Sequence, residues 1–468
     1  MKRSFFALIL FGSLALPAFS QMLPSPNDPL WRYQAWMETA GLAKPLSLGF
    51  YDSGPRATDV GGPWGGGNTV AAPRSFKEGP TFRLAPVEIG NAYNSAFPQS
   101  FNTGGVWYGV GFTPWLKAGF EARYGWLSLR IEPTLWFSEN GNFPLGPSYP
   151  AQDPSQGLPN QPLASIGGAG IDNPQRYGYS PFTSFDWGNS ELTFTYGVAV
   201  LSLGTQNFWF GPAFFNPLLL SSQAKGFPHI RLGIENWKTS IGTFQGNLLY
   251  GQLTTSPYWD PNVNNGPRFF GGLFLDYRPS FFPQLTIGLG RTIISYWSAL
   301  DWQIPTTLFD FVPWPASYNP FKYGTGESHQ HVSLTFQMLF PKVGFDVYGE
   351  WGKNDYSLSF TDYLMDLNHQ TAYMLGFRKA FVLRGGAVIG VGAEYTNMSQ
   401  NLEGLINYNG FNLFGDWNSH SVIREGYTNY GQVLAGGIGN GSAATLYADA
   451  YWRAWHWGLE LTRYNPET

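Results

Sequence analysis

Cysteine is absent from the 468 residues of this chain. Its absence excludes disulfide bonds, thiolate metal sites and a lipid anchor on an N-terminal cysteine. Charged residues are also scarce, at 12% of the chain, whereas ordinary globular domains have about 25%. A soluble protein of this length would need more surface charge than this sequence provides.

Long hydrophobic runs are missing too, with one exception near the N-terminus. After a basic start, residues 5–16 are apolar, and small residues follow as far as Ser20. This pattern predicts a secretory signal peptide, residues 1–20, that is cleaved after Ser20, and a retained membrane anchor is the alternative. No later run reaches about 18 apolar residues, which excludes a bundle of membrane-spanning helices.

Basic residues do not outnumber acidic ones. The signal peptide would remove two of the 27 Lys and Arg and none of the 31 Asp and Glu, so the mature net charge is 25 minus 31, or −6. Nucleic-acid binding normally requires a basic stripe, so we expect no nucleic-acid partner. What the chain does contain is aromatic residues, at 18%, and 58 glycines. A glycine-rich, aromatic and charge-poor chain is typical of a transmembrane β-barrel.

Alternation of side chains is clearest between residues 203 and 253. Two β-type runs, 227–237 and 240–253, follow a segment that is broken by proline and glycine. In the second run, the odd-numbered residues from 241 to 251 share one face, and neither face is charged. Such a strand meets lipid or a packed wall on one side and a wet, polar space on the other.

The same alternation predicts many further strands. They cover residues 118–124, 127–137, 192–200, 269–277, 284–291, 332–338, 345–351, 372–381, 387–395, 431–438, 445–453 and 455–464. Strands of about nine to eleven residues with aromatic ends favour a lipid-facing barrel over a soluble β-sandwich. We therefore predict an all-β fold, a transmembrane antiparallel β-barrel of about 16–18 strands over residues 46–468.

The segments outside these strands also have predicted roles. Residues 31–41 have helical spacing, with Asp28 as a cap and Pro29 in the first turn, so the segment 21–45 is predicted to plug the periplasmic side. The tract 53–104 is rich in Gly and Pro and shows few periodic runs. Long extracellular loops are expected near 140–189, 295–328 and 397–427, because their length exceeds what turns need.

Catalytic and metal-binding motifs are not recognisable in the sequence, so we predict neither an enzyme nor a cofactor. His329 and His331 flank Gln330 and would share one face of a strand, a geometry that could hold a metal. Two such histidines are more often ordinary polar residues of the barrel wall, and no metal site is predicted.

Charged residues on the strands are predicted to point into the lumen. A charge facing lipid would cost about 2–4 kcal/mol near the bilayer midplane. The residues assigned inward on this ground are Glu121, Arg123, Arg130, Glu132, Asp346, Glu350, Asp449, Arg453 and Glu460.

Aromatic residues in the loops allow two interpretations. They could anchor the barrel at the interface and pack the loops, or they could be platforms on which sugar rings stack. We favour the first from sequence alone and keep the second as the polysaccharide-binding hypothesis. The residues concerned are Trp297, Trp302, Trp314, Tyr318, Trp417 and Tyr427.

The stretch from 208 to 228 carries a family resemblance. Its residues Trp209, Gly211 and Pro212, followed by Leu219, Leu220, Ser221, Ala224 and Pro228, are similar to a Trp-Gly-Pro, a Leu-Leu-Ser-Asn-Asn-Ala-like run and a Pro in the Wzi family of outer-membrane capsule assembly proteins. Residues 426–431 and 436–439 add to the match. Phe210 is an insertion relative to that pattern, and Ser222-Gln223 stands where paired Asn is usual.

The resemblance implies a plugged outer-membrane barrel of about 18 strands that binds surface or capsular polysaccharide as a lectin. It also implies outer-membrane lipid and, as a further candidate, polysaccharide export machinery as partners. We interpret residues 209–224 as a tight turn into the wall. The alternative function is an outer-membrane diffusion porin, for example for oligosaccharides.

Overall fold

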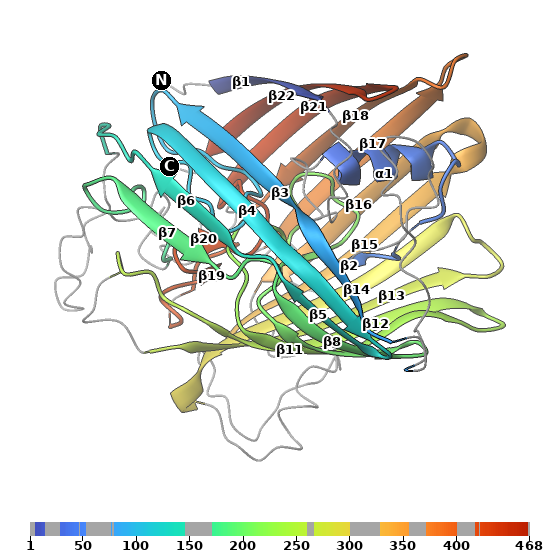
Figure 1. Ribbon diagram of the computed structural model, residues 1–468, viewed down its shortest axis with the longest axis horizontal. Helices are drawn as coiled ribbons and strands as arrows, with labels where there is room; N and C mark the ends of the chain where they lie inside the picture. The colour runs from blue at the N-terminus through green and yellow to red at the C-terminus, as the bar shows by residue number, and fades with distance from the viewer. Residues whose placement is uncertain are drawn as a thin grey trace.

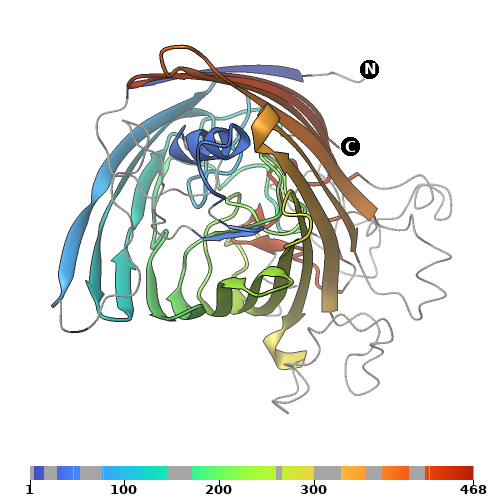
Figure 2. The ribbon, with the colours of Figure 1, turned by 90° about the vertical axis from the view of Figure 1, so that its right-hand side faces the viewer.

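A single antiparallel sheet of 18 strands forms most of the protein and curls into a barrel (Figures 1 and 2). The computed structural model describes residues 5–14, 29–45, 47–52, 76, 79–145, 171–259, 266–299, 328–354, 371–399, 417–420 and 422–466. The predicted all-β antiparallel barrel with one short N-terminal helix is confirmed.

The first group of wall strands is interrupted. It comprises β3 (Thr81–Asn94), β4 (Gly111–Tyr124), β5 (Leu127–Ile131), β6 (Thr134–Ser138), β7 (Phe182–Asp186), β8 (Glu191–Tyr196) and β9 (Ala199–Gly204). Because β4 pairs with both β5 and β6, these two short strands continue one another along the wall. On their other side, β5 pairs with β8 and β6 pairs with β7.

The second group is regular. It comprises β11 (His229–Lys238), β12 (Gly242–Leu253), β13 (Arg268–Pro279), β14 (Leu285–Tyr296), β15 (Ser328–Phe340), β16 (Phe345–Asn354), β17 (Thr371–Val382), β18 (Val388–Asn397), β21 (Gly441–Trp452) and β22 (Trp455–Pro466). Each strand pairs with the next in an uninterrupted antiparallel series.

Side chains alternate between a buried inner face and an apolar outer face. Leu84, Ile89 and Leu446 point outward and are 71%, 79% and 60% exposed, whereas Thr445 and Asp449 point inward and are buried. Large apolar side chains exposed at alternate positions, as on β11 (His229–Lys238) and β17 (Thr371–Val382), are what a lipid-facing wall requires. The period-2 pattern of the sequence therefore reports the two sides of a membrane-spanning wall.

The two ends of the barrel differ in the length of their connections. At the short-turn end, strands are joined by turns such as 239–241, 280–284 and 453–454, and by the single helical turn η5 (Pro341–Val343). At the long-loop end, the connections include 95–110, 205–228 and 398–440. Helix α1 (Pro29–Thr39) lies inside the short-turn end, as Figure 2 shows.

Residues 5–14 of the predicted signal peptide form a strand in the full-length chain. This strand, β1 (Phe5–Leu14), pairs antiparallel with β22, from Phe5 opposite Tyr464 to Leu14 opposite Trp455. The order of the sheet places β22 beside β3, and no residue register joins those two strands in the described part of the chain. Cleavage after Ser20, and the division at residues 20 and 45, stay predictions.

Several segments differ from the sequence-based expectation. The predicted strand 192–200 is a hairpin of β8 and β9 with its turn at 197–198, and the predicted strand 127–137 is divided into β5 and β6. β3 lies in the tract 53–104, where few periodic runs were expected, because a bulge between Ala85 and Glu88 breaks its alternation. β7 lies within the expected loop 140–189. The predicted strand 431–438 is wrong: only β20 (Gln432–Val433) forms there, and it pairs with β19 (Thr428–Asn429).

Candidate functional site in the barrel lumen

The connection between β9 and β11 folds into the lumen. This segment, residues 205–228, is called the luminal loop below. Its short strand β10 (Phe208–Phe210) pairs with β2 (Phe50–Asp52) and not with the wall. Gly211, at φ 95°, donates its N–H to the carbonyl of Gly49 at 2.9 Å. The interpretation of this motif as a turn into the wall is therefore wrong, because its apolar side chains fill the lumen instead.

Two buried wall carboxylates bind the backbone of the luminal loop. Glu394 on β18 accepts N–H bonds from Phe214 at 2.6 Å, Phe215 at 3.1 Å and Asn216 at 2.8 Å. Glu350 on β16 accepts the N–H of Leu218 at 3.0 Å. These carboxylates therefore clamp the loop to the wall at two points.

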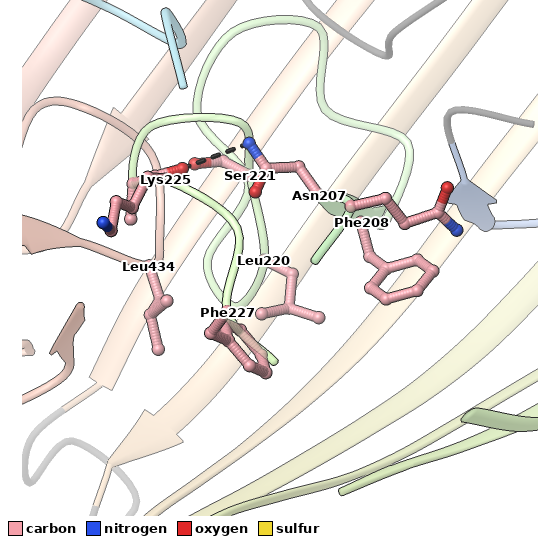
Figure 3. A pocket seen from close by; sticks show the side chains of 9 residues that line it. Asn207, Phe208, Leu220, Ser221, Lys225, Phe227 and Leu434 are labelled. Atoms are coloured by element: carbon pink, nitrogen blue, oxygen red, sulfur yellow. Dashed lines mark hydrogen bonds between the residues drawn. The ribbon is translucent and has the colours of Figure 1, made fainter. Parts of the chain in front are cut away.

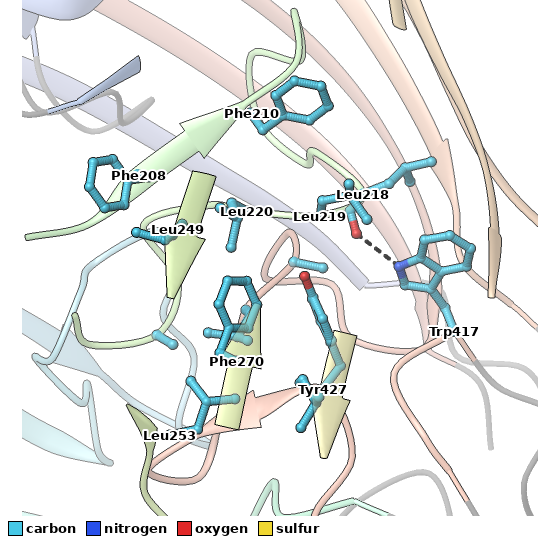
Figure 4. Close-up of a cluster of buried hydrophobic side chains, with 14 of the residues drawn as sticks. Phe208, Phe210, Leu218, Leu219, Leu220, Leu249, Leu253, Phe270, Trp417 and Tyr427 are labelled. Atoms are coloured by element: carbon cyan, nitrogen blue, oxygen red, sulfur yellow. Dashed lines mark hydrogen bonds between the residues drawn. The ribbon is translucent and has the colours of Figure 1, made fainter. Parts of the chain in front are cut away.

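Apolar side chains of the luminal loop pack against the long connection between β18 and β21 (Figure 4). Trp417 from that connection donates its indole N–H to the carbonyl of Leu218 at 2.9 Å. The backbone N–H of Ser221 bonds to the carbonyl of Leu434 at 2.9 Å. Leu219 and Tyr427 are fully buried in the same cluster. Two loops from different parts of the chain thus share one hydrophobic core inside the barrel.

Helix α1 is fixed to the wall by a buried ion pair. Arg32 binds Asp449 on β21 through Nε at 3.0 Å and Nη2 at 2.8 Å. Trp36 donates its indole N–H to the same carboxylate at 2.8 Å, and His456 lies 2.8 Å from it. The Arg32 guanidinium also lies over the ring of Phe214 at 5.3 Å. The helix, the wall and the luminal loop are therefore joined at one point.

The opposite inner wall is lined by charges that pair with one another. On β3 and β4, Arg83 binds Glu121 at 3.0 Å, and Arg123 binds the same carboxylate. Lys117 lies 3.5 Å from Glu132. Arg123 and Glu121 share β4, whereas Arg83 and Glu121 lie on neighbouring strands, so these attractions stabilise the wall itself.

The structure places most of the charges that were assigned inward on the inner face. Glu121, Arg130, Glu132, Asp346, Glu350 and Asp449 are buried there. Asp346 is bound by Arg378 of β17. Glu460 is the weaker partner of Arg32, at 3.7 Å. Arg453 differs: it is exposed in the turn between β21 and β22 at φ 52°, because the strand ends one residue earlier.

The six aromatic residues of the polysaccharide-binding hypothesis do not form one surface. Trp302, Trp314 and Tyr318 lie outside the described residues. Trp417 is 2% exposed and Tyr427 is fully buried, so in this structure neither ring offers a face to a ligand. Trp297 is partly exposed at the long-loop end, where its ring meets that of Phe269 edge-on at 5.3 Å.

Sequence reasoning missed a stack of aromatic rings at the long-loop end. The rings of Trp107 and Tyr177 are parallel, with centroids 4.1 Å apart, and the ring of Tyr258 is tilted by 35° against that of Tyr177 at 4.9 Å. Of these three rings only that of Tyr258 is partly exposed. Three separate connections supply them, which is why no local pattern could have predicted the stack.

A buried hydrogen bond holds two of those connections together. Asp172 accepts the backbone N–H and the hydroxyl of Ser256, both at 2.6 Å. Burial raises the pKa of Asp172 to about 6, although the bonds from Ser256 lower it. Arg268 and Glu425 are the charged groups that face this carboxyl group.

Cavities around the luminal loop are small. One of about 10 Å³ lies between its two arms and Leu434, with Asn207, Ser221 and Lys225 among its lining residues (Figure 3). This volume has room for about one water molecule. At this position the described residues leave no space for a sugar ring.

Metal binding finds no support in the described ranges, where no group of three His, Cys, Asp or Glu side chains is arranged to hold an ion. The rings of His329 and His331 lie 4.5 Å apart and pack against the aromatic cluster, and His331 donates to the carbonyl of Trp417 at 2.7 Å.

Among the helices of the described residues, none combines the length and the apolarity that a membrane crossing demands.

Comparison with solved structures identifies the architecture. The chain is similar to Wzi of Escherichia coli, described as a carbohydrate-binding outer-membrane β-barrel involved in group 1 capsule assembly, with a TM-score of 0.57 and 14% identity over 93% of this chain and 84% of that one. OprB of Pseudomonas putida gives a TM-score of 0.38 and 10% identity over 83% and 94% of the two chains. OprD of Pseudomonas aeruginosa gives 0.28 and 11% over 83% and 91%.

Sequence comparisons add nothing to this likeness, because no family model and no curated protein matches the chain. What is established is the fold: the protein has an outer-membrane β-barrel architecture like that of Wzi.

Proposed function

We propose that this protein is an outer-membrane barrel that binds surface or capsular polysaccharide and takes part in capsule or exopolysaccharide assembly or attachment. The observation that carries the proposal is the filled lumen. The luminal loop, the connection 398–440 and α1 share buried apolar clusters with the wall. Such an interior favours a binding protein over an open channel. The similar fold of a carbohydrate-binding barrel supports the same function.

The ligand would bind at the long-loop end, where aromatic rings remain accessible. Tyr258, which packs against Tyr177, and Trp297 are both partly exposed. An aromatic ring suits the apolar face of a pyranose, and neighbouring amides and hydroxyls can bind its hydroxyl groups. We expect a cleaved signal peptide, outer-membrane localisation, no catalytic activity and no cofactor. Export machinery at the periplasmic side is a further candidate partner.

The test uses the purified protein and the exopolysaccharide of its own organism. We expect binding to the polysaccharide, and weaker binding by Tyr258→Ala and Trp297→Ala. The matched control is Trp455→Ala, which removes an outward-facing ring at the short-turn end. Equal binding by wild type and both loop variants would contradict the site.

A diffusion porin is the second candidate, and the charged inner wall along β3 to β8 favours it. Arg83 and Arg123 keep 34% and 26% of their side chains exposed. Single-channel recording in a planar bilayer separates the two functions. We expect no steady conductance from wild type; a stable open current without polysaccharide binding would support the porin.

A further inference from the structure

Among the described residues, four exposed cations lie in or beside the turns of the short-turn end. Lys342 lies in η5 between β15 and β16, Arg384 in the turn between β17 and β18, and Arg453 in the turn between β21 and β22. All three are exposed. Lys238, beside the turn between β11 and β12, is exposed as well. The turns 239–241, 280–284, 341–344, 383–387 and 453–454 contain no Asp or Glu.

Acidic groups near this end are already engaged or turned inward. Asp346 is fully buried and binds Arg378. Glu235 pairs with Arg231 at 3.1 Å. Glu38 of α1 accepts a hydrogen bond from Gln34 at 2.8 Å. These three acids are therefore engaged by other groups, in a chain whose overall charge is negative.

Two basic side chains near this rim, Lys379 and Arg453, lie beside aromatic rings that are exposed on the outer face. Lys379 points outward on β17, and its ammonium group lies 5.2 Å from the ring of Phe381 and donates to the carbonyl of Val343. The Arg453 guanidinium lies 4.7 Å from the ring of Trp452. A long cationic side chain that keeps its stem on apolar surface and its charge at the rim is typical of the level of lipid headgroups.

Exposed apolar side chains accompany these cations in each turn. Val343 is 61% exposed beside Lys342, and Val382 and Leu383 are 50% and 45% exposed beside Arg384. The hairpins that carry the cations are neighbours in the sheet, since β16 pairs with β17 and β18 with β21. Strands about 4.8 Å apart bring successive turns of this kind to roughly 10 Å spacing along the rim.

We propose that the turns between β15 and β16, β17 and β18, and β21 and β22 form a binding surface for anionic phospholipid headgroups. The short-turn end of such barrels faces the periplasm, so the ligand is lipid of the periplasmic leaflet. Each cation offers its charge to a phosphate while the adjoining apolar residues contact acyl chains. An acidic soluble protein would fit the charge but not the continuity with the lipid-facing wall.

The experiment compares two double variants. The first combines Lys342→Gln and Arg384→Gln, and the second, the matched control, combines Arg424→Gln and Arg463→Gln. Arg424 and Arg463 lie toward the long-loop end, so both variants lose two positive charges. Full-length barrels are reconstituted in nanodiscs containing equal parts of phosphatidylglycerol and phosphatidylcholine. The phosphatidylglycerol that stays bound after detergent extraction is measured by native mass spectrometry.

We expect the first pair to lower phosphatidylglycerol retention about tenfold and the second pair to leave it unchanged, since each rim cation contributes separately to the attraction. High salt should reduce the difference, because it screens exposed charges. Equal retention by wild type and the first variant overturns the proposal, as does an equal loss in both variants. Heat-modifiable migration on gels confirms that each barrel is folded.

Discussion

The two halves of the inner wall use their charges differently. Along β3 to β8, charges from neighbouring strands pair with one another, as Arg83 and Glu121 do. Along β16 to β21, Asp346 pairs with Arg378 of the neighbouring strand, but two other wall carboxylates bind luminal elements. Glu394 binds the luminal loop and Asp449 binds α1. A charge that pairs within the wall stabilises only the wall. A charge that binds a luminal element determines whether the lumen is filled.

The largest effect should follow from Glu394→Ala. Three buried N–H groups of the luminal loop would lose their acceptor, at about 1–3 kcal/mol each. We expect the loop to leave its position and a current to appear in planar-bilayer recordings. Glu394→Gln keeps one acceptor oxygen and should conduct less. A silent Glu394→Ala barrel would show that the clamp does not hold the loop.

Asp449→Ala should come next, because it leaves Arg32 buried without its main partner, at a cost of about 3–5 kcal/mol. We expect faster hydrogen exchange in α1 with unchanged exchange in β3 and β4. Glu460→Gln is the control, since that carboxylate is 3.7 Å from the guanidinium and contributes less. Unaltered protection of α1 in Asp449→Ala would mean that packing alone retains the helix.

Asp172 gives a pH-dependent test at the long-loop end. Its folded pKa of about 6 exceeds the unfolded value of about 4, so the folded state binds the proton more tightly. Stability should therefore fall as the pH rises from about 4 to about 6 and should level off above that. In Asp172→Asn this part of the slope should vanish, as measured by unfolding at several pH values. The same slope in both proteins would assign it to other groups.

The smallest effect is expected for Glu121→Ala in the other half. Its partners Arg83 and Arg123 are 34% and 26% exposed, so water can solvate them after the change. We expect a loss below about 1 kcal/mol in unfolding free energy and no conductance. A current from this variant would erase the distinction between the two halves.

Sequence alternation was enough to predict the wall but not its contents. The direction of Asp346 or Glu350 follows from period 2, because an outward charge would face lipid. Arg453 was assigned wrongly, since alternation does not show where a strand ends and a turn begins. The segment 208–224 is as apolar as a wall strand, so composition could not show that it lies inside.

The partners of the luminal loop lie beyond the range of local patterns. Phe214 and Glu394 are 180 residues apart in sequence, and Trp417 and Leu218 are 199 apart. Burial of Trp417 follows from those contacts and has no periodic signature. The sequence therefore predicts that the chain forms a barrel. The filling of the barrel depends on contacts between residues far apart in the chain, which local sequence patterns do not reveal.

The binding of the luminal loop by the Glu394 carboxyl group has one more consequence. The carboxyl group recognises three consecutive main-chain amides, so the binding does not depend on which side chains residues 214 to 216 carry. An engineer could redesign those positions, for instance to line the interior with new polar groups, and still find the segment anchored in place. The attachment point and the chemistry presented there are separable properties of this barrel.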